Sequence, residues 1–166
     1  MENPAKTQTL SGESRQYLSF VLDHETYAFE VLKVREVLES TRITRVPKTA
    51  PFLVGVINLR GSVVPVVDLR LKFELKAADT TIDTSIIIAE TVLDGETLVI
   101  GALVDAVKAV VRLDPSEIEE TPKVGMRVAR DFVQAIGRKN DQFLILLDAD
   151  RIFTRDELDA TTGVGH

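Results

Sequence analysis

Few residues of this chain have the chemistry for catalysis or metal binding. The sequence has no cysteine and only two histidines, His24 and the terminal His166. Disulfides, thiol nucleophiles, iron–sulfur clusters and cysteine-ligated zinc are therefore excluded, as is any site that needs two histidines from the folded body. A Ser–His–Asp arrangement would have to use His24. Because His24 stands among charged residues in a predicted hairpin turn, we interpret it as a solvated turn residue.

The acidic residues give no clearer sign of a reactive site. Asp148 and Asp150, with Asp141 nearby, could bind a hard cation, but the glycine-punctuated loop of a calcium site is absent. Helix capping and solvent exposure are the favoured interpretation of these three. Glu119 and Glu120 fit a solvated face. Since the nine glycines never take a nucleotide-loop spacing, we expect no enzyme, no cofactor and no metal site.

Composition limits the partners. The 166 residues are 45% hydrophobic, carry a net charge of −6 and include only 5% aromatics, which disfavours nucleic-acid binding. The N-terminus lacks the basic start and apolar run of a signal peptide, and no apolar run approaches the roughly 20 residues of a membrane helix. We expect a soluble cytoplasmic protein with no direct membrane insertion.

Short strands are the dominant predicted elements, because apolar residues alternate at period two or form short runs rich in Val and Ile. Asp94–Gly95 is a strong hairpin signal, and Pro65 predicts an edge strand or a bulge. Asp114-Pro115 predicts the start of a short helix, as does a capping-box pattern at residues 154–157, and residues 76–84 predict a loop. The strands are expected at residues 17–22, 26–31, 54–59, 63–67, 85–89, 97–104, 107–113 and 143–147.

Two parts of the chain repeat earlier ones in the same order, which indicates an internal duplication. VLDHET at residues 21–26 reappears as VLDGET at 92–97, with five of six residues identical. VVPVVDLRLKF at 63–73 is similar to FLILLDADRIF at 143–153, so Asp68 and Asp148 both follow a strand and can cap a helix. Alternating strands also resemble one another without common origin, but the shared order favours two related units.

Units of 60–70 residues are marginally stable alone, so we expect the two to fold as one body. Small antiparallel sheets commonly close into barrels, which removes exposed edges. The sequence therefore predicts a mainly β protein with two small β-barrels and short helices after Asp68 and Asp148.

The segment at residues 50–71 is the strongest candidate for a functional surface. Two apolar strands meet at Asn58-Leu59-Arg60-Gly61, where Gly61 suits the turn. The planar guanidinium of Arg60 could bind a partner's carboxylate or carbonyls through two N–H groups at once. A plain solvated loop arginine is the alternative.

This segment also resembles a known family. The pattern FxxGVxNLRGxxxPVxDL at residues 52–69 is similar to the signature of CheW-type chemotaxis coupling proteins. FxVxxVxEV at 29–37, LVDxV at 103–107 and FLILLD at 143–148 match other parts of the family pattern. Ala106 departs from it, since glycine is frequent there; we expect tolerance if its φ is negative. The resemblance covers about residues 17–155.

The resemblance implies two five-stranded, SH3-like β-barrels packed on a shared hydrophobic core. It implies a non-enzymatic adaptor that couples the cytoplasmic hairpin tips of chemoreceptors to the regulatory domain of the histidine kinase CheA in membrane-associated arrays. We expect it to be a monomer alone. The expected organisation is a tail at 1–16, a CheW-like domain at 17–160 with subdomains at about 22–80 and 85–153, and a tail at 161–166. The first strand and a short C-terminal helix would pack on the subdomains.

Five residues lie at family positions associated with partner binding, and each has a structural alternative. They are Val34 (barrel core), Glu36 (plain exposed strand residue), Gly55 (close backbone packing), Asn58 (turn stabilisation) and Arg60 (solvated loop). The first barrel is the better candidate for the receptor tip. Val104 and Val107 of the second barrel could face the kinase or belong to the core.

Two other functions stay open. A related scaffold in a non-flagellar pathway, for pilus motility or gene control, would have the same fold and different partners. A ligand-binding or enzymatic barrel is a third hypothesis, which a large rise in melting temperature with one metabolite would favour.

Overall fold

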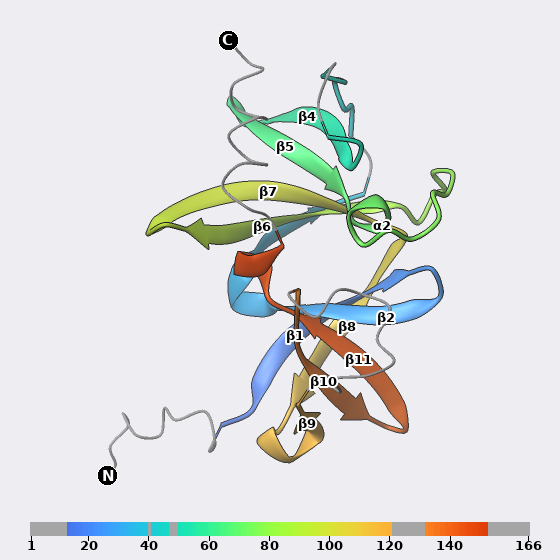
Figure 1. Ribbon diagram of the computed structural model, residues 1–166, viewed down its shortest axis with the longest axis vertical. Helices are drawn as coiled ribbons and strands as arrows, with labels where there is room; N and C mark the ends of the chain where they lie inside the picture. The colour runs from blue at the N-terminus through green and yellow to red at the C-terminus, as the bar shows by residue number, and fades with distance from the viewer. Residues whose placement is uncertain (1–12, 40, 47–49, 121–131, 153–166) are drawn as a thin grey trace.

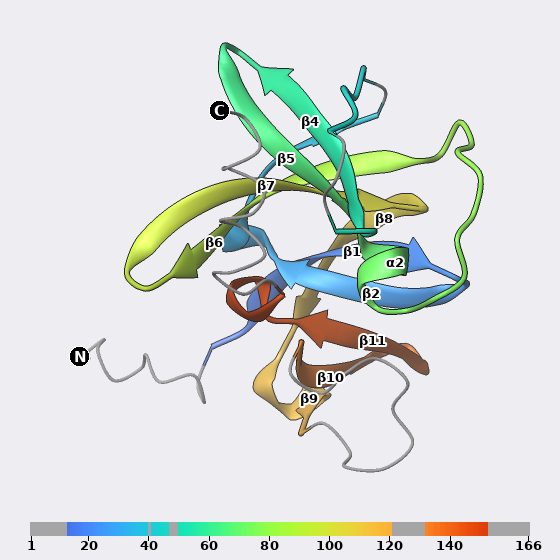
Figure 2. The ribbon, with the colours of Figure 1, turned by 45° about the horizontal axis from the view of Figure 1, so that its top comes forward.

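Two β-sheets make up most of the chain that the computed structural model describes, which is residues 13–39, 41–46, 50–120 and 132–152. They lie one above the other, with the short helix α2 (Leu69–Lys72) between them (Figures 1 and 2). The expected mainly β fold with two small barrels is confirmed. The expected C-terminal helix near residues 154–160 and the 161–166 tail lie outside the described residues.

The first sheet, sheet A, has six strands in the order β8-β1-β2-β11-β10-β9. All neighbours are antiparallel except β2 and β11, which run parallel. One more strand is present than the five expected, because the two-residue β9 joins the edge. The bounds are β1 Arg15–Leu22, β2 Glu25–Glu30, β8 Ala106–Leu113, β9 Ile118–Glu119, β10 Val133–Lys139 and β11 Gln142–Leu147.

The second sheet, sheet B, has five strands in the order β3-β6-β7-β5-β4. Here β5 and β7 are the parallel pair. A single bridge from Thr44 to Val56 of β4 takes the place that β9 has in sheet A. The bounds are β3 Val34–Leu38, β4 Leu53–Leu59, β5 Ser62–Asp68, β6 Ser85–Leu93 and β7 Glu96–Val104.

The segments that form each sheet differ from the expected subdomains at 22–80 and 85–153. Hairpin β1–β2 comes from the first repeat but pairs with β8 and β11 of the second. Hairpin β6–β7 comes from the second repeat but pairs with β3 and β5 of the first. Each repeat therefore gives its N-terminal hairpin to the sheet of the other. This exchange explains why two units of marginal size form one body.

One hydrophobic core spans both sheets, as expected. Phe20 and Phe29 of sheet A pack in the same buried cluster as Ile87 and Ile100 of sheet B. Smaller clusters fill the interior of each barrel, around Leu146 in sheet A and Val66 in sheet B.

The repeats share their turns and caps. Asp23 and His24 have positive φ at the tip of β1–β2, as Asp94 and Gly95 have at the tip of β6–β7. The Asp68 carboxylate accepts the N–H of Arg70 at 2.9 Å, while that of Asp148 accepts the N–H of Asp150 at 3.0 Å. Both predicted helix caps are thus confirmed, although α2 has four residues and η4 (Ala149–Arg151) is a single 3-10 turn.

Several predicted elements differ in detail. β1 begins at Arg15, inside the expected tail, while Val31 lies in the 3-10 turn η2 (Val31–Lys33) and not in a strand. The predicted helix start at Asp114 is the 3-10 turn η3 (Pro115–Glu117). Pro65 lies in an inner strand, but the parallel ladder with β7 begins one residue later at Val66, so its missing N–H leaves that ladder intact.

Candidate partner-binding surface

The predicted turn between β4 and β5 is present, and it places Arg60 at an exposed corner of sheet B. Arg60 and Gly61 both have positive φ, 51° and 90°, the combination typical of tight two-residue hairpin turns. The side-chain oxygen of Asn58 accepts the N–H of Gly61 at 2.9 Å, so Asn58 stabilises the turn. The Arg60 side chain is 72% exposed.

The structure brings together two of the predicted site residues, Arg60 and Glu36. The Nη2 group of Arg60 donates to the Glu36 carboxylate in a close ion pair. Glu36 lies on β3 and Arg60 follows β4, and these are the two edge strands of sheet B. The pair therefore links the open edges of the barrel. An exposed pair of this kind contributes about 0–1 kcal/mol, so a partner can compete for it.

Side chains alternate in exposure along β3. Arg35 and Val37 are exposed, and Glu36 between them is only half-exposed. Arg35 forms its own ion pair with Glu90 of β6. Glu36 thus stands on the opposite face of the strand from its neighbours.

One exposed apolar side chain at this corner was not predicted from the sequence. Val63 of β5 is 71% exposed and lies directly opposite Asn58 in the β4–β5 register. Period-two alternation from the buried Val64 could have indicated Val63. Together with the ion pair and Asn58, Val63 forms a polar surface with one apolar side chain, which we call the Arg60 corner (Glu36, Asn58, Arg60 and Val63).

Gly55 and Val34 have internal positions. A Cβ atom on Gly55 would lie 2.1 Å from the carbonyl oxygen of Thr44, which itself accepts the N–H of Val56 at 2.8 Å. Gly55 therefore permits the 41–46 segment to cross close over β4. Val34 is partly buried and packs against the shared core. For both residues the geometry matches the structural alternative named above.

The two residues considered for a kinase-facing surface differ in burial. Val104 is only 2% exposed and belongs to the shared core, so it offers no surface to a partner in this conformation. Val107 is partly buried against the same core. Ala106 between the two has no positive φ, so alanine causes no backbone strain there.

Sheet A has a corner of its own at the repeat-related turn between β10 and β11. Arg138 forms a close ion pair with Glu119 of β9, and its guanidinium lies 5.7 Å from the ring centre of the exposed Phe143. We call these three residues the Arg138 corner. The two corners are alike in charge and opposite in position on the body.

Several acidic residues that were considered above for a reactive site bind other groups of the protein. No group of three His, Cys, Asp or Glu side chains there could hold a metal ion. Asp148 caps η4, and the Asp150 carboxylate binds Lys33 at 2.8 Å, so two of the three acids considered for a cation have structural partners. Burial raises the pKa of the Asp68 carboxyl, more than its bonds to the N–H groups of Leu71 and Arg70 lower it. That carboxyl caps α2, where it accepts the N–H groups of Arg70 and Leu71.

Among the described residues, no helix is both long and apolar enough to cross a membrane.

Comparisons with known proteins agree with one another. The family model for the CheW-like domain matches residues 16–157. The chemotaxis protein CheW of Klebsiella aerogenes is 32% identical over 160 residues, which cover 95% of this chain and 94% of that protein. The chemotaxis protein CheW of Thermotoga maritima is 33% identical over 162 residues, with 95% and 99% covered. The crystal structure of the scaffolding protein CheW from Thermoanaerobacter tengcongensis matches with a TM-score of 0.79 and 32% identity, covering 87% of this chain and 96% of that one.

Proposed function

This chain belongs to the CheW-like domain family, and we propose that it is a non-enzymatic adaptor coupling the cytoplasmic tips of chemoreceptors to the histidine kinase CheA. The family is one of chemotaxis scaffold proteins. The single observation that supports the proposal most is the Arg60 corner, where an exposed arginine and its acidic partner link the two edge strands of sheet B beside an exposed valine of β5.

The Arg60 corner has the features of a small docking surface. Arginine is among the residues most frequent at the energetic centres of interfaces. Its guanidinium has five N–H donors, and the bond to Glu36 engages Nη2, so other donors can bind a carboxylate or carbonyl of a partner. The turn is held by Asn58, so docking needs little backbone change.

A protein that bridges two partners needs a second docking surface, separate from the Arg60 corner. We assign the receptor tip to sheet B, at the Arg60 corner. We assign the kinase regulatory domain to an exposed face of the second barrel, with the partly buried Val107 near its margin and Val104 excluded by burial. In an array, many moderate contacts of this kind add through multivalency. The adaptor itself would be a cytoplasmic monomer that the receptors recruit to the membrane.

Binding measurements with two matched variants test the assignment. Arg60→Ala and Arg138→Ala each remove one exposed arginine that pairs with a glutamate at a corner of a sheet. We expect Arg60→Ala to weaken binding to a receptor-tip fragment by about 1–4 kcal/mol, and Arg138→Ala to leave that binding nearly unchanged. Thermal unfolding should be nearly the same for both variants and the wild type.

The outcomes separate the parts of the proposal. Equal receptor binding by the wild type and Arg60→Ala removes Arg60 from the surface. Failure of the wild type to bind either the receptor fragment or the kinase regulatory domain overturns the function.

A further inference from the structure

The two segments where the chain crosses from one sheet to the other are each fastened by an ion pair. The crossing from β2 to β3 runs through η2, and the crossing from β7 to β8 runs through Asp105. Each crossing bonds to the short helix of one repeat, and each ion pair also holds the tip of an exchanged hairpin. We call these two contacts the Asp105 clasp (Asp105, Arg70 and Asp23) and the Lys33 clasp (Lys33, Asp150 and Val92).

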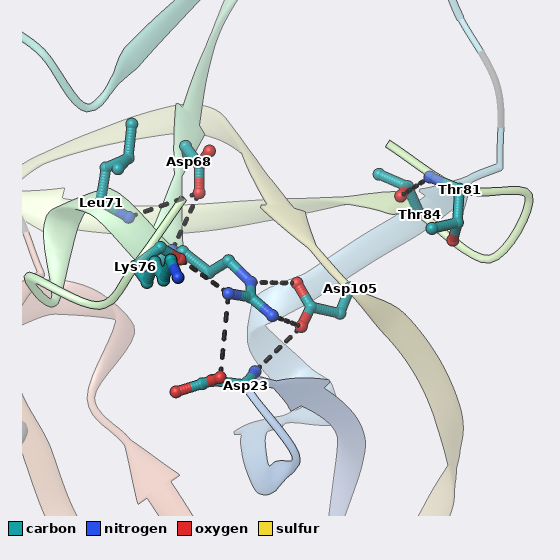
Figure 3. A network of polar contacts seen from close by, with 8 residues as sticks. Asp23, Asp68, Leu71, Lys76, Thr81, Thr84 and Asp105 are labelled. Atoms are coloured by element: carbon teal, nitrogen blue, oxygen red, sulfur yellow. Dashed lines mark hydrogen bonds and ion pairs between the residues drawn. The ribbon is translucent and has the colours of Figure 1, made fainter. Parts of the chain in front are cut away.

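The Asp105 clasp is tight and partly buried (Figure 3). Arg70 of α2 binds both carboxylate oxygens of Asp105, with Nε to Oδ1 at 2.8 Å and Nη2 to Oδ2 at 2.7 Å. Its Nη1 donates to the carbonyl oxygen of Lys76 at 2.7 Å. The N–H of Asp23, at the tip of β1–β2, donates to Asp105 Oδ2 at 2.9 Å. The Arg70 side chain is only 14% exposed.

The Lys33 clasp has the same plan with the charges reversed. Here the acid, Asp150, is on the short helix η4, at the repeat position that Arg70 has in α2, and the base, Lys33, is on the crossing. Lys33 Nζ lies 2.8 Å from Asp150 Oδ1. The N–H of Val92, near the tip of β6–β7, donates to the same oxygen at 2.8 Å.

The two clasps differ in strength. A two-point arginine–carboxylate contact that is shielded from water is stronger and more directional than a one-point lysine contact. The Lys33 side chain is 27% exposed, and Asp150 is more exposed still. A surface pocket of about 220 Å³, lined among others by Lys33, Asp150 and Gln134, leaves the Lys33 clasp open to water. The Lys33 clasp is therefore the weaker of the two.

We propose that the two barrels move relative to each other as a hinge whose pivot is the Asp105 clasp and whose opening side is the Lys33 clasp. When the Lys33 clasp opens, the N–H of Val92 loses its bond to Asp150. The Asp105 clasp stays closed and keeps the N–H of Asp23 bonded. The consequence for signalling rests on the proposed function: with receptor and kinase on different barrels, the hinge angle links the state of one to the position of the other.

Amide hydrogen exchange at Val92 and Asp23 tests the hinge, since each amide bonds to the carboxylate of one clasp. In the wild type, corrected for intrinsic rates, the Val92 amide should exchange faster than that of Asp23. Lys33→Gln should speed exchange at Val92 about two- to fivefold, as expected for loss of a partly exposed ion pair, and leave Asp23 unchanged. Arg35→Gln is the matched control, because it removes a neighbouring charge whose partner Glu90 lies within the same sheet.

Equal protection of the two amides in the wild type overturns the hinge, as does equal acceleration of both by Lys33→Gln. A control variant with the same effect as Lys33→Gln also overturns it. Lys33→Arg keeps the charge and should restore slow exchange at Val92, which separates loss of the clasp from a folding defect.

A distance measurement gives a second readout. Because the chain has no cysteine, Thr97→Cys and Gln142→Cys place one spin label on an exposed strand position of each sheet. Lys33→Gln should broaden the distance distribution toward a second population, and Arg35→Gln should leave it narrow. A distribution that Lys33→Gln leaves unchanged contradicts the hinge. Both readouts use the protein without partners. The hinge can therefore be contradicted while the adaptor function stands, and the adaptor function can be contradicted while the hinge stands.

Discussion

The β4–β5 turn of sheet B and the β10–β11 turn of sheet A are repeat-related, yet they hold their arginines differently. In sheet B the arginine is a turn residue itself, Arg60, and it reaches across to β3 at the other edge of the sheet. In sheet A the turn residues are Asn140 and Asp141. Arg138 lies two residues before Asn140, in β10, and its guanidinium lies over the ring of Phe143.

The difference indicates how a duplicated body acquires two unlike faces. The backbone of the turn is kept, since both turns have two successive residues of positive φ. Side chains on that common backbone have diverged: one corner presents a guanidinium to solvent, and the other folds its guanidinium onto an aromatic ring. The two corners therefore present different side chains on the same backbone turn.

The largest expected contrast between the sheets comes from two strand glycines. Gly55→Ala should lower the free energy of unfolding by about 2–4 kcal/mol, because the new methyl group would meet the hydrogen-bonded carbonyl of Thr44 at 2.1 Å. Gly137→Ala in sheet A should cost only about 1 kcal/mol, since its nearest neighbour is the movable end of Leu113. Urea denaturation measures both, and equal losses would contradict the close crossing over β4.

The clasps should give the next largest contrast. Arg70→Gln should lower the free energy of unfolding by about 1–3 kcal/mol, because it leaves the partly buried Asp105 carboxylate without its charged partner. Lys33→Gln should lower it by no more than about 1 kcal/mol, since that pair is more exposed. The same urea series measures both, and a larger loss for Lys33→Gln would reverse the ranking of the clasps.

Acid should weaken the Asp105 clasp in a defined direction. Burial alone would raise the pKa of the Asp105 carboxyl, but bonds from Arg70 and from the N–H of Asp23 outweigh it and hold the pKa below its usual value. A carboxyl with a lowered pKa stabilises the fold above its unfolded pKa and loses that contribution as pH falls through its folded pKa. The stability difference between the wild type and Asp105→Asn should therefore shrink below roughly pH 4.

Urea denaturation at several pH values measures this difference. Asp79→Asn, in the exposed loop, is the control and should differ little from the wild type at every pH. A difference for Asp105→Asn that stays constant from neutral pH to about pH 3 would show that the carboxylate's charge does not stabilise the clasp.

The smallest expected difference in stability concerns the register shifts in the β1–β8 pair of sheet A and the β3–β6 pair of sheet B. In sheet A the buried Ser19 hydroxyl donates to the carbonyl of Ala109 at 2.9 Å and accepts its N–H at 3.2 Å, where the β1–β8 register shifts. Ser19→Ala should cost about 1 kcal/mol. At the repeat-related place in sheet B, Glu90 bonds the exposed Arg35, so Glu90→Ala should cost no more than about 0.5 kcal/mol. Thermal unfolding compares the two, and equal shifts would contradict the difference in burial.

Local features of the fold followed from the sequence because they depend on neighbouring residues. Asp94–Gly95 predicted a tight turn through backbone freedom, and Asp68 and Asp148 predicted helix caps through free N–H groups. The order of the repeats predicted two similar units. Strand β10 was missed because Gln134 and Gly137 interrupt its apolar pattern, and β9 because two residues carry no pattern.

Long-range features could not be predicted in the same way. A hairpin has the same alternation whichever sheet it joins, so the exchange of hairpins between repeats left no local sign. The contact between Glu36 and Arg60 depends on the closure of sheet B, which brings its two edges together. Family resemblance pointed to both residues, but the ion pair between them appears only in the fold.

Kinase recruitment to receptor membranes tests the central claim most directly. Receptor-containing membranes are sedimented with the histidine kinase, in the presence and absence of this protein. We predict that the kinase sediments only when the protein is added, and that Arg60→Ala strongly lowers the amount while Arg138→Ala does not. Kinase sedimentation that is the same with and without the protein would contradict an adaptor that bridges the two.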